Sequence, residues 1–444
     1  MGNFVALDLG ASSTRYVSES GQINVLPNNV AFLNNEQVSA LEPDNADIES
    51  CLEVQIRKTD GVDSEYFPAN VLMGILAERS AEIVERPSII SHKYKQRINY
   101  ISAIVATAIS RLKYNLDEDI AMYLAVPPAQ IMGARKEFPE MLCGRYDVTF
   151  PKYNNGVTVK LNISSVTVYE ESFMSVTSFF FNMNGTLKES AKELMAGSVL
   201  SLDIGASTCD LTITKNGRFL DKSGQTYNHG GNEIRSMVID AVRGQYNIDV
   251  PIALADTMLA EGRLQLGNTY KVLTNEINDA KTKLAKRLTA LFVDYFAKVE
   301  VPIHYVNAIV VSGGGSLQSQ YVNADGEIVK TSEPMSYFMT QEMLKWSEGT
   351  MVVEYGNEAR FANVKGLYIR AMVDSMKKKQ MTPAPVQPTQ QVAQSVQPAA
   401  PVQPAQPVTQ PVTPAQPIQQ VAPTQSEQPA TAPVQPAGVQ TTAV

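Results

Sequence analysis

The sequence Asp8-Leu-Gly-Ala-Ser12 returns later in the chain as Asp203-Ile-Gly-Ala-Ser207. In both places a short apolar run stops at the aspartate, and an apolar run resumes after a small polar turn. This pattern predicts a strand, a tight turn and a second strand, and a further turn follows each copy. Unrelated hairpins have no reason to agree at four positions, so we infer an internal duplication and expect two related domains facing each other.

Segments outside the two copies indicate both strands and helices. Ile120–Val126 is a short apolar run stopped by two prolines, which predicts a buried strand. In Gln96–Leu112, apolar residues recur at helical spacing. We also expect strands at 157–168 and 308–311, and helices at 189–195, 232–246, 269–298 and 364–379. Strands that alternate with helices predict a mixed α/β fold.

The last part of the chain differs in composition from the rest. Residues 381–444 hold 14 of the 25 prolines and a single charged residue, Glu427, and they contain no aromatic residue. Such a segment cannot bury enough apolar surface to offset the entropy lost on ordering. We therefore predict a disordered, polyproline-II-rich tail after a folded body that is long enough for two domains.

Composition and charge exclude several classes of protein. No apolar run is long enough to span a membrane, and no basic region precedes the apolar N-terminal stretch as it would in a secretory signal. The three cysteines are widely spaced, which predicts neither a metal motif nor a disulfide framework and fits a cytoplasmic protein. The net charge of −8 argues against a broad basic surface for nucleic acid, although DNA can still be reached through a partner protein.

The repeated turn has the residue types of a phosphate and metal site. Glycine lets the backbone approach a ligand closely, and small neighbours leave amide N–H groups free to bind an anion. The aspartate that opens each turn, Asp8 or Asp203, suits a hydrated Mg²⁺ held against that phosphate. One such turn alone is more often only a hairpin bend, whereas two matched copies favour a grip on a triphosphate from both sides.

A third candidate element follows the apolar run Ala308–Val311. There the chain reads Ser312-Gly-Gly-Gly-Ser316. Three glycines after a buried strand indicate a backbone packed against a flat ligand or against the start of a helix. Without the two turns, a flexible loop would be the more common interpretation.

In this order and spacing, the three motifs resemble the phosphate 1, phosphate 2 and adenosine motifs of the actin superfamily, over roughly residues 1–372. Three further segments resemble the plasmid-segregation actins of the ParM/StbA type: Val168-Tyr-Glu-Glu-Ser172, His229-Gly-Gly-Asn-Glu233 and Phe361-Ala-Asn-Val-Lys-Gly-Leu-Tyr368. The resemblance implies two duplicated actin-like (ribonuclease-H-like) domains around a nucleotide cleft. These would be residues 1–172 and 173–380, with the helix at about 364–379 packing back on the first domain and the tail at 381–444.

The same resemblance assigns roles to individual residues. Glu171 is implied as the catalytic carboxylate that positions the attacking water, with Glu170 as the alternative because it stands where the pattern has proline. Asp8 and Asp203 would assist catalysis by holding Mg²⁺ through water. The residues expected to contact the nucleotide are Gly10, Ala11, Ser12, Ser13, Arg15, Gly205, Ala206, Ser207, Thr208, Gly230, Gly231, Glu261, Arg263, Gly313, Gly314, Gly315 and Ser316.

Other conspicuous residues have plainer interpretations. His229 is expected to be structural, because a carboxylate suffices for the chemistry. Trp346 and Phe179–Phe181 are expected in the core or at a subunit contact. Arg15 stands where the pattern usually has lysine, which keeps the charge and changes its geometry.

The implied function is that of a filament-forming ATPase. ATP-bound subunits would polymerise, Mg-dependent hydrolysis would destabilise the polymer, and a DNA-binding adaptor would connect the filament to plasmid or phage DNA. GTP is the alternative nucleotide. A small-molecule kinase, a chaperone-type ATPase and a cell-shape or division actin stay open as alternatives from the same superfamily. The tail would either space filaments, recruit a partner through many weak copies, or be dispensable.

Overall fold

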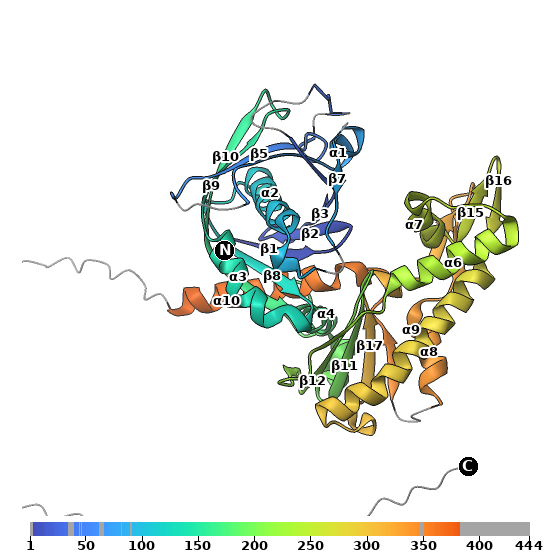
Figure 1. Ribbon diagram of the computed structural model, residues 1–444. Helices are drawn as coiled ribbons and strands as arrows, with labels where there is room; N and C mark the ends of the chain where they lie inside the picture. Colours follow the sequence, from blue (N-terminus) through green and yellow to red (C-terminus); the bar gives the residue numbers. More distant parts are fainter. Residues whose placement is uncertain are drawn as a thin grey trace, which may run out of the picture. The chain divides into compact units, whose positions relative to one another are not determined.

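The computed structural model describes residues 3–381, except 34–39, 44, 46, 62–65, 81, 89–90 and 346–349. Trp346 and the predicted tail beyond residue 381 lie outside these residues, so the expectations for both stay predictions. Within the described residues, helices pack around two large sheets, and two small hairpins accompany the second one (Figure 1).

The N-terminal sheet consists of ten described strands in the order β3-β2-β1-β8-β10-β9-β5-β6-β4-β7. They are β1 (Phe4–Leu9), β2 (Ser13–Ser18), β3 (Ile23–Pro27), β4 (Val30–Phe32), β5 (Glu53–Lys58), β6 (Ala69–Met73), β7 (Val84–Glu85), β8 (Asp119–Val126), β9 (Gly144–Phe150) and β10 (Val157–Glu170). Every residue of β1 is buried, as expected for a central strand whose two faces are both covered.

Three helices accompany this sheet: α1 (Ile75–Arg79), α2 (Arg97–Tyr114) and α3 (Ile131–Leu142). The predicted helix at 96–112 is thus confirmed as α2. Its side chains are buried without a break from Ile98 to Ser110, so it is more enclosed than its periodic pattern alone predicts. Together with α3 it forms a continuous apolar core against the sheet.

The second sheet consists of six described strands in the order β13-β12-β11-β17-β20, with β14 beside β12. They are β11 (Ser198–Ile204), β12 (Cys209–Lys215), β13 (Arg218–Phe219), β14 (Gln225–Tyr227), β17 (Ala308–Ser312) and β20 (Met351–Glu354). The helices of this half are α5 (Lys192–Met195), α6 (Gly231–Tyr246), α7 (Ile252–Glu261), α8 (Thr274–Val299) and α9 (Met335–Met343). The small hairpins are β15 (Arg263–Leu266) with β16 (Thr269–Val272) and β18 (Ser319–Val322) with β19 (Ile328–Ser332).

The two large sheets share one pattern of strand pairing. β1 is antiparallel to β2 and parallel to β8, and β8 is parallel to β10. In the same way β11 is antiparallel to β12 and parallel to β17, and β17 is parallel to β20. The mixed α/β class and the duplication expected from the two matched turns are therefore confirmed.

Two helices contact both sheets. α4 (Glu171–Phe180) follows β10 directly, and its Ser172 and Ser175 hydroxyls bond to Thr212 of β12 and Ser312 of β17. α10 (Ala362–Met381) packs beside α4 and against β1 (Figure 1). That close approach requires Gly366, because a Cβ there would collide with the backbone of Met174. The exact domain boundaries stay a prediction.

One predicted helix begins later than expected. Residues 269–298 were expected to be helical throughout, but 269–272 form β16 and the helix begins at Thr274. The chain turns at Gly267, whose φ is 60°, and pairs back on β15. None of the helices in the described part of the chain is long and apolar enough to cross a membrane.

Candidate nucleotide site

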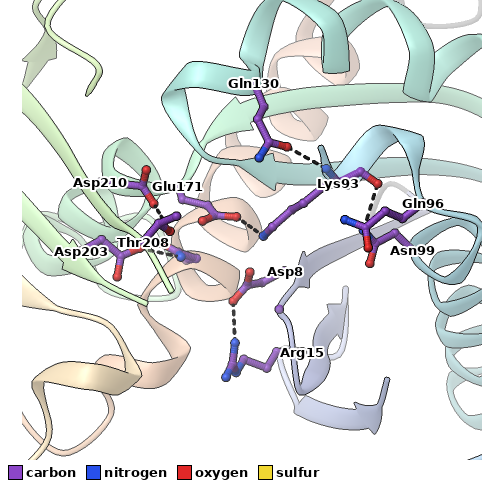
Figure 2. Close-up of polar contacts among 12 residues, drawn as sticks. Asp8, Arg15, Lys93, Gln96, Asn99, Gln130, Glu171, Asp203, Thr208 and Asp210 are labelled. Atoms are coloured by element: carbon purple, nitrogen blue, oxygen red, sulfur yellow. Dashed lines mark hydrogen bonds and ion pairs between the residues drawn. The ribbon is translucent and has the colours of Figure 1, made fainter. Parts of the chain in front are cut away.

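The first matched turn, between β1 and β2, is closed by its own backbone. The Gly10 amide donates to the Ser13 carbonyl at 3.1 Å, and the Asn28 side chain donates to the Gly10 carbonyl. Asp8 is 3 % exposed and lies directly across the hairpin from Arg15. The Arg15 guanidinium donates to Asp8 Oδ2 at 3.1 Å (Figure 2). This turn therefore presents a buried carboxylate that already has a cationic partner.

The second turn, between β11 and β12, is closed in the same way but has different side-chain partners. The Gly205 amide donates to the Thr208 carbonyl at 2.8 Å. Asp203 Oδ2 accepts a hydrogen bond at 2.8 Å from Asn363 of α10, and Asp210 stands opposite Asp203 in the hairpin. Burial raises the pKa of Asp203 to about 6.

Asp210 is the less satisfied of these two carboxylates. It is 1 % exposed; its Oδ2 accepts from Thr208, but its Oδ1 has no hydrogen-bond partner. Burial raises its pKa to about 7, and the nearby Asp203 charge acts in the same direction. Two adjacent buried carboxylates, one of which has an oxygen that accepts no hydrogen bond, are well suited to bind a cation.

Two glycine loops fix the second turn in place. The amides of Gly231 and Asn232, at the start of α6, donate to the carbonyls of Gly205 and Ala206 at 3.0 and 2.7 Å. Gly313, which follows β17, has a φ of 87°, and a Cβ there would collide with Asp203 Oδ1 and the Ile204 carbonyl. Glycine is therefore needed at this position both for backbone conformation and for space.

Both turns open onto one cavity of about 1160 Å³, to which both sheets contribute. This is slightly larger than the usual volume of small-molecule sites, about 300–1,000 Å³. The predicted residues that line it are Asp8, Gly10, Ala11, Ser12, Arg15, Glu171, Asp203, Gly205, Ala206, Ser207, Thr208, Gly231, Gly313, Gly314 and Gly315. The structure thus brings segments from five separate parts of the sequence to one site.

The two neighbouring glutamates differ in position. Glu171, the first residue of α4, lines the cavity and is 7 % exposed. Burial acts to raise its pKa, and the Lys93 charge opposes this effect. Glu170 is not part of the lining and approaches Gly224 instead. Of the two alternatives, only Glu171 is placed to meet a ligand in the cavity.

Five predicted residues do not line the cavity: Ser13, Gly230, Ser316, Glu261 and Arg263. The first three belong to the lining loops but contribute their backbone to holding them; the Ser316 amide, for example, donates to the Gly313 carbonyl at 3.1 Å. Glu261 and Arg263 form an ion pair with each other at 2.7 Å. The Arg263 guanidinium stacks between Tyr270 and Tyr321, joining the two small hairpins, because planar cations pack well on aromatic faces.

Sequence reasoning missed two buried lysines of the lining. Lys281 of α8 donates to the carbonyls of Leu317 and Glu333 and to the Ser332 hydroxyl, and burial lowers its pKa to about 7. Lys93 pairs with Glu171. Neither lies in a motif, and an isolated lysine carries no pattern that distinguishes it from a surface residue.

The residues fit a magnesium site that is completed by water and phosphate. Among the described residues, no cluster of three or more His, Cys, Asp or Glu side chains forms a complete metal cage. Mg²⁺ does not need one, because it keeps several waters and takes one or two carboxylates plus phosphate oxygens. Buried Asp8 and Asp203, one from each turn, supply such a pair.

Two sheets of one topology, each with its Asp-x-Gly turn at a shared cavity, form an actin-like fold. A family model described as the N-terminal domain of actin-like proteins matches residues 6–173. A second model, described as the C-terminal part of the archaeal actin homologue MreB-like, matches residues 201–320. Both models describe actin-like proteins, so the chain is similar to actin-like proteins over these two segments.

Solved structures with the same fold include an actin-like protein, a ParM and an archaeal actin homologue. The actin-like protein Alp7A is 16 % identical with a TM-score of 0.62, over 86 % of this chain and 98 % of that one. Bacillus thuringiensis ParM with ATP is 17 % identical with a TM-score of 0.59, over 84 % and 99 %. Ta0583, an archaeal actin homologue, is 15 % identical with a TM-score of 0.59, over 84 % and 100 %. No curated protein matched the sequence.

Proposed function

We propose that this protein binds ATP with Mg²⁺ in the cavity between its two sheets and hydrolyses it, and that the bound nucleotide controls its assembly into filaments. The observation that carries the proposal is the convergence of two matched Asp-x-Gly-Ala-Ser turns on one cavity that also contains the buried Glu171 carboxylate. The structure of Bacillus thuringiensis ParM with ATP, a protein of the same fold, supports the choice of nucleotide.

Different groups of the cavity lining would bind the phosphates, the nucleoside and Mg²⁺. Backbone amides and hydroxyls of the turns, among them Ser12, Ser207 and Thr208, would hold the phosphates as small anion-binding concavities do. The glycines that follow β17 would pack against the nucleoside, where a side chain would block the approach. Asp8 and Asp203 would hold Mg²⁺ through water, and Mg²⁺ would supply neutralisation of the phosphate charge.

Hydrolysis then needs a water molecule aligned with the terminal phosphorus. Glu171 would accept a hydrogen bond from that water and orient it. The water oxygen bonds to the terminal phosphorus while the bond from that phosphorus to the bridging oxygen breaks, and ADP keeps the electron pair. The proton of the water passes by way of Glu171 to the released phosphate.

Coupling of this reaction to a polymer, and of the polymer to DNA, is the biological part of the proposal. Subunits with ATP would polymerise and subunits with ADP would dissociate, and an adaptor protein bound to DNA would capture the filament. The net charge of −8 supports contact with DNA through an adaptor rather than directly. Segregation of a plasmid or phage genome is the role that fits these properties.

Light scattering and negative-stain electron microscopy with Mg-ATP test the assembly. We expect scattering to rise on addition of Mg-ATP at tens of micromolar protein and to fall as ATP is consumed, with filaments visible at the plateau. Magnesium-free ATP is the control and should give no polymer. Turnover of ATP without polymer under these conditions would contradict the filament and favour a kinase-like member of the superfamily.

Glu171→Gln tests the chemistry. We expect turnover to fall by about 100- to 1,000-fold, because a positioned carboxylate typically contributes on this scale, while ATP affinity changes by less than about 3-fold. Filaments should last longer as a consequence. Glu170→Gln is the matched control, since Glu170 is adjacent in sequence and absent from the cavity lining. If the two variants hydrolyse ATP equally fast, Glu171 does not have this role.

A further inference from the structure

Lys93 places its ammonium group on the proposed catalytic carboxylate. Its Nζ is paired with Glu171 Oε1, and the two side chains are only 17 % and 9 % exposed. Both residues line the cavity (Figure 2). Burial acts to lower the pKa of Lys93, but Glu171, Asp8 and Asp210 outweigh it and raise the pKa, so the lysine stays charged at neutral pH.

The backbone at Lys93 is held in place from rigid parts of the N-terminal sheet. Its amide donates to the side chain of Gln130 at 2.8 Å, just after β8. Its carbonyl accepts from the side chain of Asn99 at 2.9 Å, in the first turn of α2. Gln96 bonds through its side-chain amide to the backbone of Ser88 and Ser91, which ties these two residues to the start of α2. The side chain is thereby directed into the cavity (Figure 2).

The contacts of Lys93 leave it free to take another acceptor. An ammonium group has three donors. Among the described residues, Glu171 is the one acceptor recorded for Lys93 Nζ, whereas Lys281 uses its ammonium on three acceptors. Asp8 and Asp210 lie near enough to interact electrostatically with Lys93. A cation thus stands among the carboxylates of the site, where phosphate groups would enter.

We propose that Lys93 is a positioning residue that distinguishes a nucleoside triphosphate from a diphosphate by moving its ammonium group from Glu171 to the terminal phosphate. This inference rests on the proposed function of the cavity. Without a terminal phosphate, Lys93 neutralises Glu171 and occupies one of the oxygens that would orient water. With one present, the more highly charged phosphate takes the ammonium, and Glu171 is released to the water.

The chemistry of lysine suits such a transfer. Its ammonium is a compact point charge on a flexible four-carbon stem, so it can exchange one acceptor for another without moving the backbone. Arg15 is another cation of the cavity lining, but its guanidinium already donates to Asp8 Oδ2 at 3.1 Å. Release of Glu171 would therefore be coupled to the arrival of the group that is to be hydrolysed.

Lys93→Met tests the proposal, with Lys95→Met as the matched control in the same helical turn. Lys95 is exposed and does not line the cavity. We expect Lys93→Met to weaken ATP binding by about 10- to 100-fold, the scale of a lost charge-assisted contact, and ADP binding by less than about 3-fold. Turnover at saturating ATP should also fall. Lys93→Arg should restore part of the ATP preference, and Lys95→Met should match the wild type.

The double variant Lys93→Met/Glu171→Gln separates binding from folding, because removing Lys93 alone leaves a buried carboxylate without its cation. Affinities for ATP and ADP are measured by calorimetry on all variants, after thermal unfolding confirms that they fold. The double variant should show the same loss of ATP preference. If the single and double variants keep the wild-type ratio of ATP to ADP affinity, Lys93 has only a structural role. A wild-type protein that binds neither nucleotide would overturn the proposed function instead.

Discussion

The two hairpins that form the site have the same strand pairing but differ in charge. In the first, Asp8 faces Arg15 across the strands; in the second, Asp203 faces Asp210 at the equivalent position. The first pair is an ion pair at 3.1 Å, whereas the second leaves Asp210 Oδ1 without a partner. One side of the cavity is therefore electrostatically satisfied on its own, and the other retains negative charge that suits a cation.

The loops beside the hairpins differ as well. In the N-terminal sheet, the parallel strand β8 leads into Pro127-Pro128, and Gln130 of this loop anchors Lys93. In the second sheet, the equivalent strand β17 leads into Gly313-Gly-Gly, which packs on the Asp203 turn. The two sheets have the same strand pairing, but the side chains in the loops at the ends of their strands differ. One half thus carries the lysine that pairs with Glu171, and the other half has the close backbone packing around the Asp203 turn.

The largest effect is expected where the second hairpin meets the glycine loop. Gly313→Ala would add a Cβ that collides with Asp203 Oδ1 and the Ile204 carbonyl, at a φ of 87°. We expect the free energy of unfolding to fall by about 3 kcal/mol, the sum of left-handed strain and overpacking. Urea denaturation measures it.

Gly314→Ala is the control for that substitution. Its Cβ would meet only Arg360 Cβ at 4.0 Å, an ordinary van der Waals contact. We expect the free energy of unfolding of Gly314→Ala to fall by less than about 1 kcal/mol, as is typical of a site without strain. Equal losses for the two variants would show that the loop adjusts as a unit and that Gly313 has no special position.

The comparison also shows what the sequence could and could not predict. The turns and the Gly-Gly-Gly loop were predictable because their constraint is local: a small set of glycines and hydroxyls repeats beside apolar runs. The Asp203 bond to Asn363 and the Lys93 pair with Glu171 were not, because each joins residues far apart in the chain. The surroundings of Glu261 and Arg263 were not predictable for a similar reason: Tyr321, on a distant hairpin, stacks on the Arg263 guanidinium, and neither residue lines the cavity.

An intermediate effect is expected at the glycines of the two matched turns. In the first turn a Cβ on Gly10 would lie 2.7 Å from the Ser13 carbonyl and 2.9 Å from Arg15 Nη1. In the second, a Cβ on Gly205 would lie 3.3 Å from the Thr208 carbonyl. We expect the free energy of unfolding to fall by about 2 kcal/mol in Gly10→Ala and by less than about 1 kcal/mol in Gly205→Ala, on the usual scale of overpacking.

Thermal and urea unfolding of these two alanine variants, without nucleotide, decide the point. The Arg15 guanidinium can shift, but the Ser13 carbonyl belongs to the turn itself and cannot move without opening it. A cost for Gly205→Ala that equals or exceeds that for Gly10→Ala would mean that the two turns are not packed differently, and the comparison would then rest on charge alone.

The last prediction concerns the difference in charge between the two hairpins and its effect on the free energy of unfolding. Burial raises the pKa of Asp210 to about 7, above its value in the unfolded chain. The folded state therefore holds the proton more tightly, and this residue lowers the free energy of unfolding as the pH rises from about 4 to about 7. Asp210→Asn removes that loss, so the free energy of unfolding of the variant, relative to that of the wild type, should grow as the pH rises from 4 to 8 in the absence of nucleotide and Mg²⁺. Asp8→Asn should instead destabilise the protein at pH 8, because it takes the charged partner from Arg15. Urea denaturation at the two pH values measures both variants, and an Asp210→Asn protein that is no more stable than the wild type at pH 8 would show that the second hairpin, like the first, already neutralises its own charge.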